Sequence, residues 1–107
     1  MFFTYVQNNS YGRYETSVKD GIGSYVIIEA RNAKMANALA QSIGIYFDGV
    51  AAGIDCACCG DRWDEAYEDE GTETPQIYGS EVGDYTQKWG GESTFVHYLD
   101  GRVVNYG

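Results

Sequence analysis

The sequence contains no long apolar run and only one proline. No stretch approaches the ~20 apolar residues that a helix needs to cross a bilayer. Met1–Tyr5 lacks the basic flank and the long apolar core of a secretory signal, so it is typical of a strand. With one Pro against fourteen Gly, the 107 residues predict a single domain, residues 1–107, with many tight turns and no Pro-rich linker.

Basic residues are also scarce, since seven Lys and Arg stand against sixteen Asp and Glu, for a net charge of −9. Proteins that lie on DNA, RNA or anionic lipid need Lys and Arg to replace counterions. We therefore expect no direct nucleic-acid partner and no membrane partner, whereas a protein with a basic surface is permitted. The three cysteines are an odd number, and disulfide-stapled extracellular scaffolds normally carry an even set, so a reducing cytoplasm is expected.

Catalytic signatures are missing as well. The chain has no G-x-S-x-G nucleophile motif, and its glycines form neither a G-x-G-x-x-G nor a G-x-x-x-x-G-K-[ST] phosphate loop. The single histidine, His97, has no nucleophile that the sequence places beside it. These absences predict a protein that is not an enzyme.

What the sequence does have is a segregation of charge. Acidic and basic residues cancel within residues 1–54 and again within residues 85–107. Residues 55–84 hold ten acids and only Arg62, so all nine net negative charges lie there. We expect residues 1–54 to be a strand-strand-helix scaffold and residues 94–106 a terminal hairpin. The middle segment, with its cysteine turn and its acids, is expected to carry the function.

The densest part of the middle segment is residues 61–73, where seven acids are interleaved with two aromatic residues. Spaced carboxylates steer a basic partner towards a surface, and aromatic side chains supply a desolvated anchor. The predicted partner-binding residues are Trp63, Asp64, Glu65, Tyr67, Glu68, Asp69, Glu70 and Glu73. The alternative is a solvated loop that only keeps the protein soluble.

A cysteine cluster opens the middle segment. Cys56 and Cys59 have C-x-x-C spacing and Gly60 follows, which is typical of a tight turn that presents two thiolates to one metal ion. A structural zinc ion takes four ligands. The candidate zinc ligands are Cys56, Cys58, Cys59 and His97. Because adjacent cysteines rarely bind one ion together, a nearby carboxylate, Asp55 or Asp61, could replace one of them.

Two alternatives for the cysteines remain open. They could be small buried thiols, because an unbonded cysteine packs like an apolar residue. They could also form a redox pair, although a thioredoxin-like site would have the C-x-x-C motif opening a helix after a strand. Gly60 and the acids beside the motif would raise the thiol pKa and weaken the nucleophile.

Hydrophobic patterning predicts an α+β fold, an antiparallel sheet of four or five strands with one amphipathic helix packed on one face. The expected strands are residues 2–7, 11–17, 24–30, 94–99 and 102–106, the last two forming a hairpin at Asp100-Gly101, and residues 45–47 are a further short candidate. A helix is expected between an N-cap at Asn32 and a stop at Gly44. Met35, Leu39 and Ile43 recur within it at helical spacing, so this stripe is expected to pack on the sheet.

Several short sequence motifs are distinctive. They are Ile45-Tyr46-Phe47-Asp48-Gly49, the D-C-x-C-C-G-D-R-W motif at residues 55–63, Ile77-Tyr78-Gly79 and Val96-His97-Tyr98-Leu99-Asp100-Gly101. With these words, nearly the whole chain resembles small uncharacterised proteins encoded by tailed bacteriophages. In that group Pro often stands where this chain has Ala57, so the cysteine turn is expected to be less rigid here. The resemblance implies a phage origin and the cytoplasm of an infected bacterium, and it carries no established activity.

Two functional hypotheses follow. The first is a phage accessory protein that binds and modulates or inhibits a bacterial host or defence protein through its acidic, aromatic-bearing segment, in the host cell cytoplasm. The second is a small structural domain in which zinc, bound by the cysteines and His97, pins the middle segment to the terminal hairpin.

Overall fold

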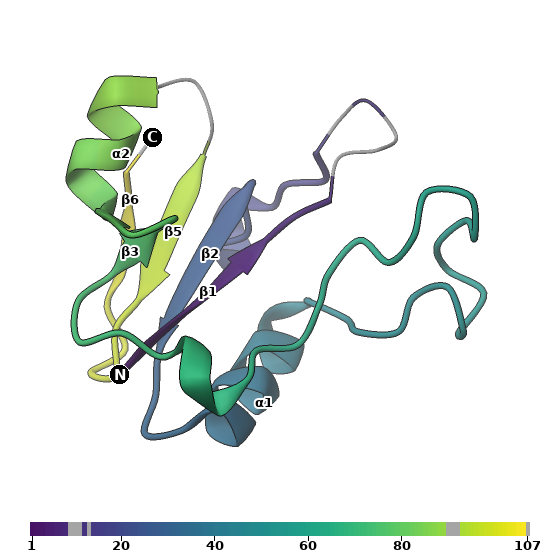
Figure 1. The fold of residues 1–107 in the computed structure, drawn as a ribbon, viewed down its shortest axis with the longest axis horizontal. Coiled ribbons are helices and arrows are strands. Elements are labelled where there is room, and N and C mark those ends of the chain that lie inside the picture. Colours follow the sequence, from purple (N-terminus) through teal and green to yellow (C-terminus); the bar gives the residue numbers. More distant parts are fainter. Residues whose placement is uncertain (9–11, 13, 90–92, 107) are drawn as a thin grey trace.

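The computed structural model describes residues 1–8, 12, 14–89 and 93–106, and it has an α+β fold with helices on both sides of a sheet (Figure 1). Over the described residues, the main sheet has four strands in the order β1 (Phe2–Val6), β2 (Tyr25–Glu29), β5 (Thr94–His97) and β6 (Val103–Asn105). A two-stranded sheet pairs β3 (Gln76–Ile77) with β4 (Ser80–Glu81). Among the described residues, the helices are α1 (Ala33–Ile43) and α2 (Val82–Trp89), and the 3-10 turns are η1 (Val18–Asp20) and η2 (Glu68–Glu70).

The main sheet is mixed. β1 pairs antiparallel with β2, and β5 pairs antiparallel with β6, which confirms the hairpin predicted near the C-terminus. β2 and β5 are parallel, with Val26 opposite Phe95, so the expectation of a purely antiparallel sheet was wrong at its centre. The reason is that residues 30–93 connect these two strands by a long crossover that contains both helices, and such a crossover returns the chain in the same direction.

Two other segments that were predicted as strands, residues 45–47 and residues 11–17, do not form regular strands where the structure describes them. Residues 45–47 form no strand, because the Ile45 N–H bonds to the Ala40 carbonyl and the apolar run leaves the helix as a loop. Within the predicted strand 11–17, Tyr11 and Arg13 lie outside the described residues. Residues 14–16 have no regular structure, and residue 17 makes only an isolated bridge.

Helix α1 has the predicted ends but buries a different face. The Asn32 side chain accepts from the Met35 N–H at 2.8 Å, and Gly44 closes the helix with a φ of 115°. The buried residues are Ala33, Ala36 and Ala40. Met35 and Leu39 are 44% and 43% exposed, so their predicted packing on the sheet was wrong. Small alanines let the helix backbone approach the sheet closely, and this leaves the larger side chains of the stripe at the edge of the contact.

Helix α2 was not predicted. Its eight residues contribute only Val82 to the buried core, and Gly83 near its start is a poor helix former. It packs on the sheet face opposite α1, where Tyr85 contacts the core around Tyr25 and Val96. Its apolar residues Val82, Tyr85 and Trp89 recur at helical spacing, but eight residues are shorter than the window over which such a period identifies a helix.

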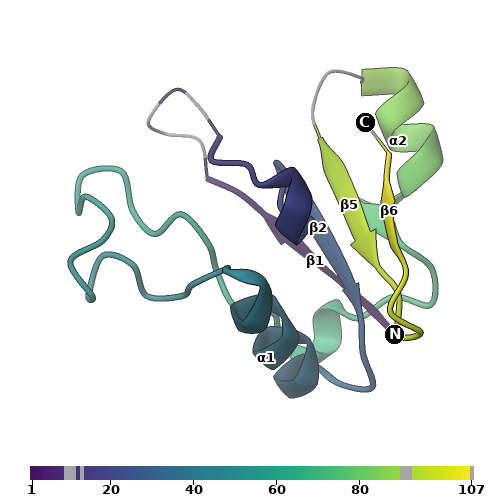
Figure 2. The ribbon, with the colours of Figure 1, turned by 180° about the vertical axis from the view of Figure 1, so that it is seen from behind.

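The main sheet buries side chains on both faces, with the alternation expected of strands. On the side of α1, which we call the α1-side core, the strands contribute Phe3, Tyr5, Val26 and Ile28. On the opposite side they contribute Phe2, Tyr25, Ile27 and Val96. Helix α1 lies below β1 in both views, on the opposite side of the sheet from α2 (Figures 1 and 2).

Candidate functional site

The acidic segment, residues 61–73, is held against the fold at both ends. At its start, the buried Arg62 donates from Nη1 to Gln7 Oε1 at 2.9 Å and lies 3.5 Å from the Glu15 carboxylate. Towards its end, Thr72 and Phe2 exchange backbone hydrogen bonds of 2.7 and 2.9 Å. Because both ends are fixed, the carboxylates between them project from an ordered backbone.

The middle of the acidic segment is fixed to α1. The Asn37 side chain donates from Nδ2 to the Ala66 carbonyl at 3.0 Å and accepts from the Ala66 N–H at 2.8 Å. Glu68 Oε1 accepts from the Ala33 N–H at 2.9 Å, which places a carboxylate at the positive N-terminal end of the helix. Part of the acidic charge is therefore structural, a role that the count of charges along the sequence did not reveal.

Trp63 does not lie on the surface of the acidic segment. It is 3% exposed and belongs to the α1-side core, so the structure does not offer it as the surface anchor that was predicted. Tyr67 is 60% exposed and is the aromatic residue of the segment that a partner can reach. The predicted acidic residues Asp64, Glu65, Glu68, Asp69, Glu70 and Glu73 are all exposed.

A hollow of about 320 Å³ opens between the acidic segment and the loop that follows α1, and we call it the acidic pocket. It is lined by Phe47, Asp48, Trp63, Asp64, Glu65, Tyr67 and Glu70. Carboxylates and aromatic rings suit a Lys or Arg side chain, because a cation is attracted by both. Sequence reasoning missed Phe47 and Asp48, since they enter the pocket through a tertiary contact, the stacking of Phe47 on Tyr5 at 6.0 Å.

The negative charge of the acidic pocket affects the pKa of a core residue beneath it, Tyr5. Burial raises the pKa of the Tyr5 hydroxyl, and the carboxylates of Glu70 and Glu65 raise it further. The hydroxyl donates to Asn37 Oδ1 at 2.7 Å. Tyr5 therefore stays a neutral hydrogen-bond donor, and it helps to hold the residue that fixes the acidic segment.

The cysteine turn, residues 55–61, lies in the loop that projects from one end of the molecule in both views (Figures 1 and 2). The Cys56 carbonyl accepts from the N–H groups of Cys59 and Gly60, both at 3.1 Å, which forms the predicted tight turn. The Sγ atoms of Cys56 and Cys58 are 2.6 Å apart, and those of Cys58 and Cys59 are 3.6 Å apart. Cys56 and Cys58 are exposed, so the alternative of buried thiols does not hold for them.

Two carboxylates shape the base of this loop. Asp55 accepts from the Tyr46 hydroxyl at 3.0 Å and from the Arg62 N–H at 2.9 Å. Asp61 accepts from the Val50 N–H at 2.8 Å. Both carboxylates that were considered as replacement metal ligands are thus engaged in holding the loop.

The two closest thiols differ in acidity. The hydrogen bond with the Cys58 side chain lowers the pKa of Cys56, and the Cys58 backbone acts in the same direction. Hydrogen bonds with the Cys56 and Cys59 side chains raise the pKa of Cys58 to about 11. Cys56 is therefore the thiol of this pair that ionises first.

His97 lies on β5, in the main sheet and away from the cysteine turn. Its Nε2 is hydrogen-bonded to the Gly21 carbonyl oxygen at 2.8 Å, and a Cβ at Gly21 would come within 2.6 Å of the imidazole ring. The described residues include every His and Cys of the chain, and among them no group of three or more His, Cys, Asp or Glu side chains is placed to hold one metal ion. The structure does not bring His97 to the thiols, so zinc binding stays a prediction that rests on the cysteines.

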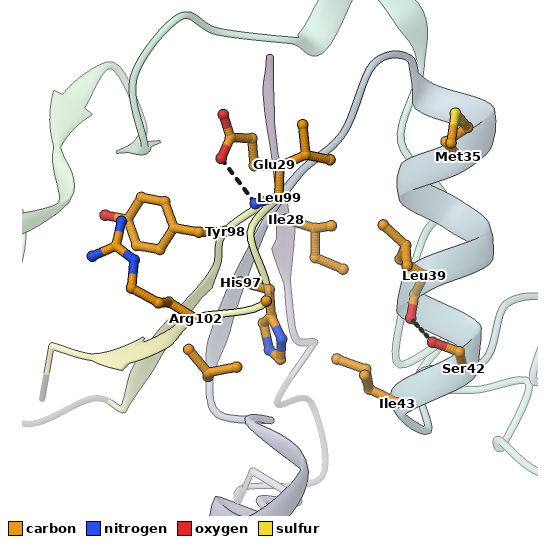
Figure 3. Close-up of a pocket in the computed structure, with 12 residues that line it drawn as sticks. Ile28, Glu29, Met35, Leu39, Ser42, Ile43, His97, Tyr98, Leu99 and Arg102 are labelled. Atoms are coloured by element: carbon orange, nitrogen blue, oxygen red, sulfur yellow. Dashed lines mark hydrogen bonds between the residues drawn. The ribbon is translucent and has the colours of Figure 1, made fainter.

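An apolar groove of about 340 Å³ separates α1 from the β5–β6 hairpin (Figure 3). Its apolar lining is Ile28, Met35, Leu39, Ile43, Leu99 and Val103. Met35 and Leu39 come from the helix on one side, and Tyr98, Leu99 and Arg102 come from the hairpin on the other. The Arg102 guanidinium lies over the Tyr98 ring, 4.4 Å from its centroid.

The apolar groove exists because α1 packs its alanine face on β1 and β2 and leaves the β5–β6 half of the sheet face open. Leu99 and Val103 are 57% and 50% exposed. A continuous exposed apolar surface is more typical of an interaction site than of a solvated face. The sequence did not reveal it, because the same Met and Leu spacing predicts either a buried or an open helix face.

None of the helices in the described residues has the length and apolar character needed to span a bilayer. The chain belongs to the family described as Domain of unknown function (DUF7296), whose model matches residues 1–107. This match confirms the predicted membership of an uncharacterised family. No curated protein and no solved structure matches the chain.

Proposed function

We propose that this member of the family is a small non-enzymatic phage protein that binds and modulates a bacterial host or defence protein in the host cytoplasm. The observation that carries the proposal is the acidic pocket, in which carboxylates and aromatic rings from two separate segments meet around one hollow. The phage and host context is supported by the resemblance of sequence words such as D-C-x-C-C-G-D-R-W.

The acidic pocket suits one Lys or Arg side chain of the partner. Asp64 and Glu65 supply exposed carboxylates, and Tyr67 supplies an exposed ring. A cation over an aromatic ring contributes about 0.5–1 kcal/mol at an exposed site, and a hydrogen bond to a carboxylate adds to it. The net charge of −9 steers a basic surface towards this face and raises the association rate.

The apolar groove gives the same partner a second contact. A further hollow, lined by Lys34, Ala38, Gln41, Glu65 and Tyr67 among others, joins the acidic segment to the outer surface of α1. The groove lies on the other flank of that helix, so a partner that spans α1 contacts both surfaces. Stable interfaces bury about 800 Å² on each partner, more than one side-chain pocket provides. We therefore expect the partner to place apolar side chains beside its basic residue.

A capture experiment with two charge-matched variants tests the proposal. D64N/E65Q removes two carboxylates of the acidic pocket, and D69N/E73Q removes two exposed carboxylates of the same segment that do not line it. Immobilised chains are incubated with bacterial lysate, and the captured proteins are quantified by mass spectrometry. A captured protein is then purified, and its affinity for each chain is measured.

We expect D69N/E73Q to retain the partner and D64N/E65Q to weaken it by about tenfold, which corresponds to about 1.4 kcal/mol. Equal losses would mean that only net charge attracts the partner. Equal retention would mean that the acidic pocket is not part of the interface. Either result removes the proposal in this form.

A further inference from the structure

We propose that Cys56 and Cys58 form a redox-active dithiol that closes to a disulfide by exchange with a low-molecular-weight disulfide such as oxidised glutathione. The pair is distinct from the C-x-x-C pair that the sequence nominates, and the inference does not depend on the proposed partner-binding function. The site is a cluster of three thiols in the projecting loop between α1 and the acidic segment.

The position of the two sulfurs carries the inference. The Sγ atoms of Cys56 and Cys58 are 2.6 Å apart. A disulfide bond is about 2.05 Å long, so small rotations of the two side chains bring the sulfurs to bonding distance. Both residues are exposed, which lets a small disulfide reach either sulfur.

The surrounding bonds disfavour Cys59 as the partner. Cys59 is less exposed, its N–H donates to the Cys56 carbonyl at 3.1 Å, and its own carbonyl accepts from Asn8 Nδ2 at 2.9 Å. Its sulfur is nearest to that of Cys58, at 3.6 Å. A disulfide between adjacent residues closes a very small ring that distorts the intervening peptide bond away from planarity. Cys56 and Cys58, separated by Ala57, avoid this distortion.

The exchange proceeds in two balanced steps. The Cys56 thiolate attacks one sulfur of oxidised glutathione, the glutathione S–S bond breaks, and one glutathione leaves as a thiolate while a Cys56–glutathione disulfide forms. Cys58 then loses its proton to solvent and attacks the Cys56 sulfur, which displaces the second glutathione thiolate and forms the Cys56–Cys58 bond. Two electrons pass from the protein dithiol to oxidised glutathione, which becomes two molecules of glutathione after protonation.

Peptide mapping of the full chain tests the inference. The purified protein is analysed for metal and is then equilibrated, before and after chelator treatment, in reduced and oxidised glutathione at a series of ratios, quenched with acid, alkylated and digested. We expect the wild-type peptide to carry an internal bond between Cys56 and Cys58, with Cys59 alkylated. Cys58→Ser should stop at the glutathione adduct of Cys56, with at least about tenfold less internal disulfide, whereas Cys59→Ser should match wild type within about twofold.

Three results would overturn the inference. Loss of the internal disulfide in Cys59→Ser with retention in Cys58→Ser would assign the C-x-x-C pair instead. Wild-type protein that forms only glutathione adducts, or no product, across the whole series would show that the thiols do not act as a pair. Metal that co-purifies, and whose removal by a chelator is needed before any oxidation, would assign the thiols to a metal site.

Discussion

Asn37 bonds to both backbone polar groups of Ala66, at 2.8 Å to its N–H and at 3.0 Å to its carbonyl. The same Oδ1 atom accepts from the Tyr5 hydroxyl at 2.7 Å. One side chain of α1 therefore joins the helix, the first strand and the acidic segment. The pocket residues on either side of Ala66 owe their position to this contact.

Asn37→Ala should lower the free energy of unfolding by about 2–3 kcal/mol, because a lost hydrogen bond costs about 1 kcal/mol and leaves its partner group unsatisfied. Urea denaturation followed by tryptophan fluorescence measures the change. Gln41→Ala, at an exposed position of the same helix, is the control and should change stability by less than about 0.5 kcal/mol. Equal losses in the two variants would contradict the role of Asn37.

Because α1 buries its alanines and exposes Leu39, enlarging an alanine of this helix should destabilise the protein more than replacing Leu39 by a polar residue. Ala40 is 0% exposed, so Ala40→Leu should cost about 1–3 kcal/mol through overpacking against the sheet. Leu39 is 43% exposed, so Leu39→Gln should cost less than about 1 kcal/mol. Thermal or urea denaturation gives the order. A larger loss of stability in Leu39→Gln than in Ala40→Leu would contradict the burial of the alanine face and would support packing of the Met, Leu and Ile stripe on the sheet.

Local signals predicted those parts of the fold that are set by local chemistry. Asn32 and Gly44 gave the ends of α1, and Asp100-Gly101 gave the terminal hairpin. The parallel pairing of β2 with β5 could not be predicted in this way, because it depends on where a long crossover returns. The face of α1 that is buried depends likewise on how closely the helix approaches the sheet, which its apolar spacing does not specify.

The two-residue turn between β3 and β4 should store backbone strain at Tyr78. Tyr78 and Gly79 have φ values of 51° and 82°, a combination that favours Asn and Gly over a bulky residue. The Tyr78 ring is held by edge contact with Tyr25 at 6.1 Å and by a tilted contact with Tyr85 at 5.9 Å. Tyr78→Ala and Tyr78→Asn both lose these ring contacts, and only Asn relieves the strain.

We therefore expect Tyr78→Asn to be more stable than Tyr78→Ala by about 0.5–1 kcal/mol, measured by urea denaturation. Thr74→Asn, outside the turn, should differ little from Thr74→Ala and serves as the comparison. If Tyr78→Ala equalled or exceeded Tyr78→Asn in stability, the turn would carry no strain at this position.

The terminal hairpin should contribute less to stability in acid. The Arg102 N–H, and then the Arg102 side chain, hold the pKa of the Asp100 carboxyl below its usual value. A carboxyl whose pKa is lower in the folded state stabilises the protein above its unfolded pKa, and this contribution disappears as the pH falls through the folded pKa. Carboxyl NMR titration should show the low pKa in wild type. Arg102→Gln should raise it only partly, because the backbone N–H remains, and an unchanged pKa would contradict the side-chain contribution.

The sequence predicts the negative charge of the candidate site, but it does not predict which side chains form the pocket. The acids of residues 61–73 are visible in the sequence, and most of them are exposed. The sequence does not show that Trp63 is buried and Tyr67 is exposed, because both aromatic residues are interleaved with acids and only the tertiary packing separates them. His97 was grouped with the cysteines because it is the single histidine, whereas the topology gives it a carbonyl partner in Gly21.

The central claim is that the acidic pocket binds a basic side chain. NMR titration of the isotope-labelled full chain with Nα-acetyl-lysine methylamide tests it most directly, with the uncharged norleucine derivative as the control ligand. We predict that the amide signals of Phe47, Glu65 and Tyr67 shift with the lysine derivative, stay in place with norleucine, and shift much less in D64N/E65Q than in D69N/E73Q. Identical shifts with both ligands, or shifts confined to residues outside the acidic pocket, would contradict the claim.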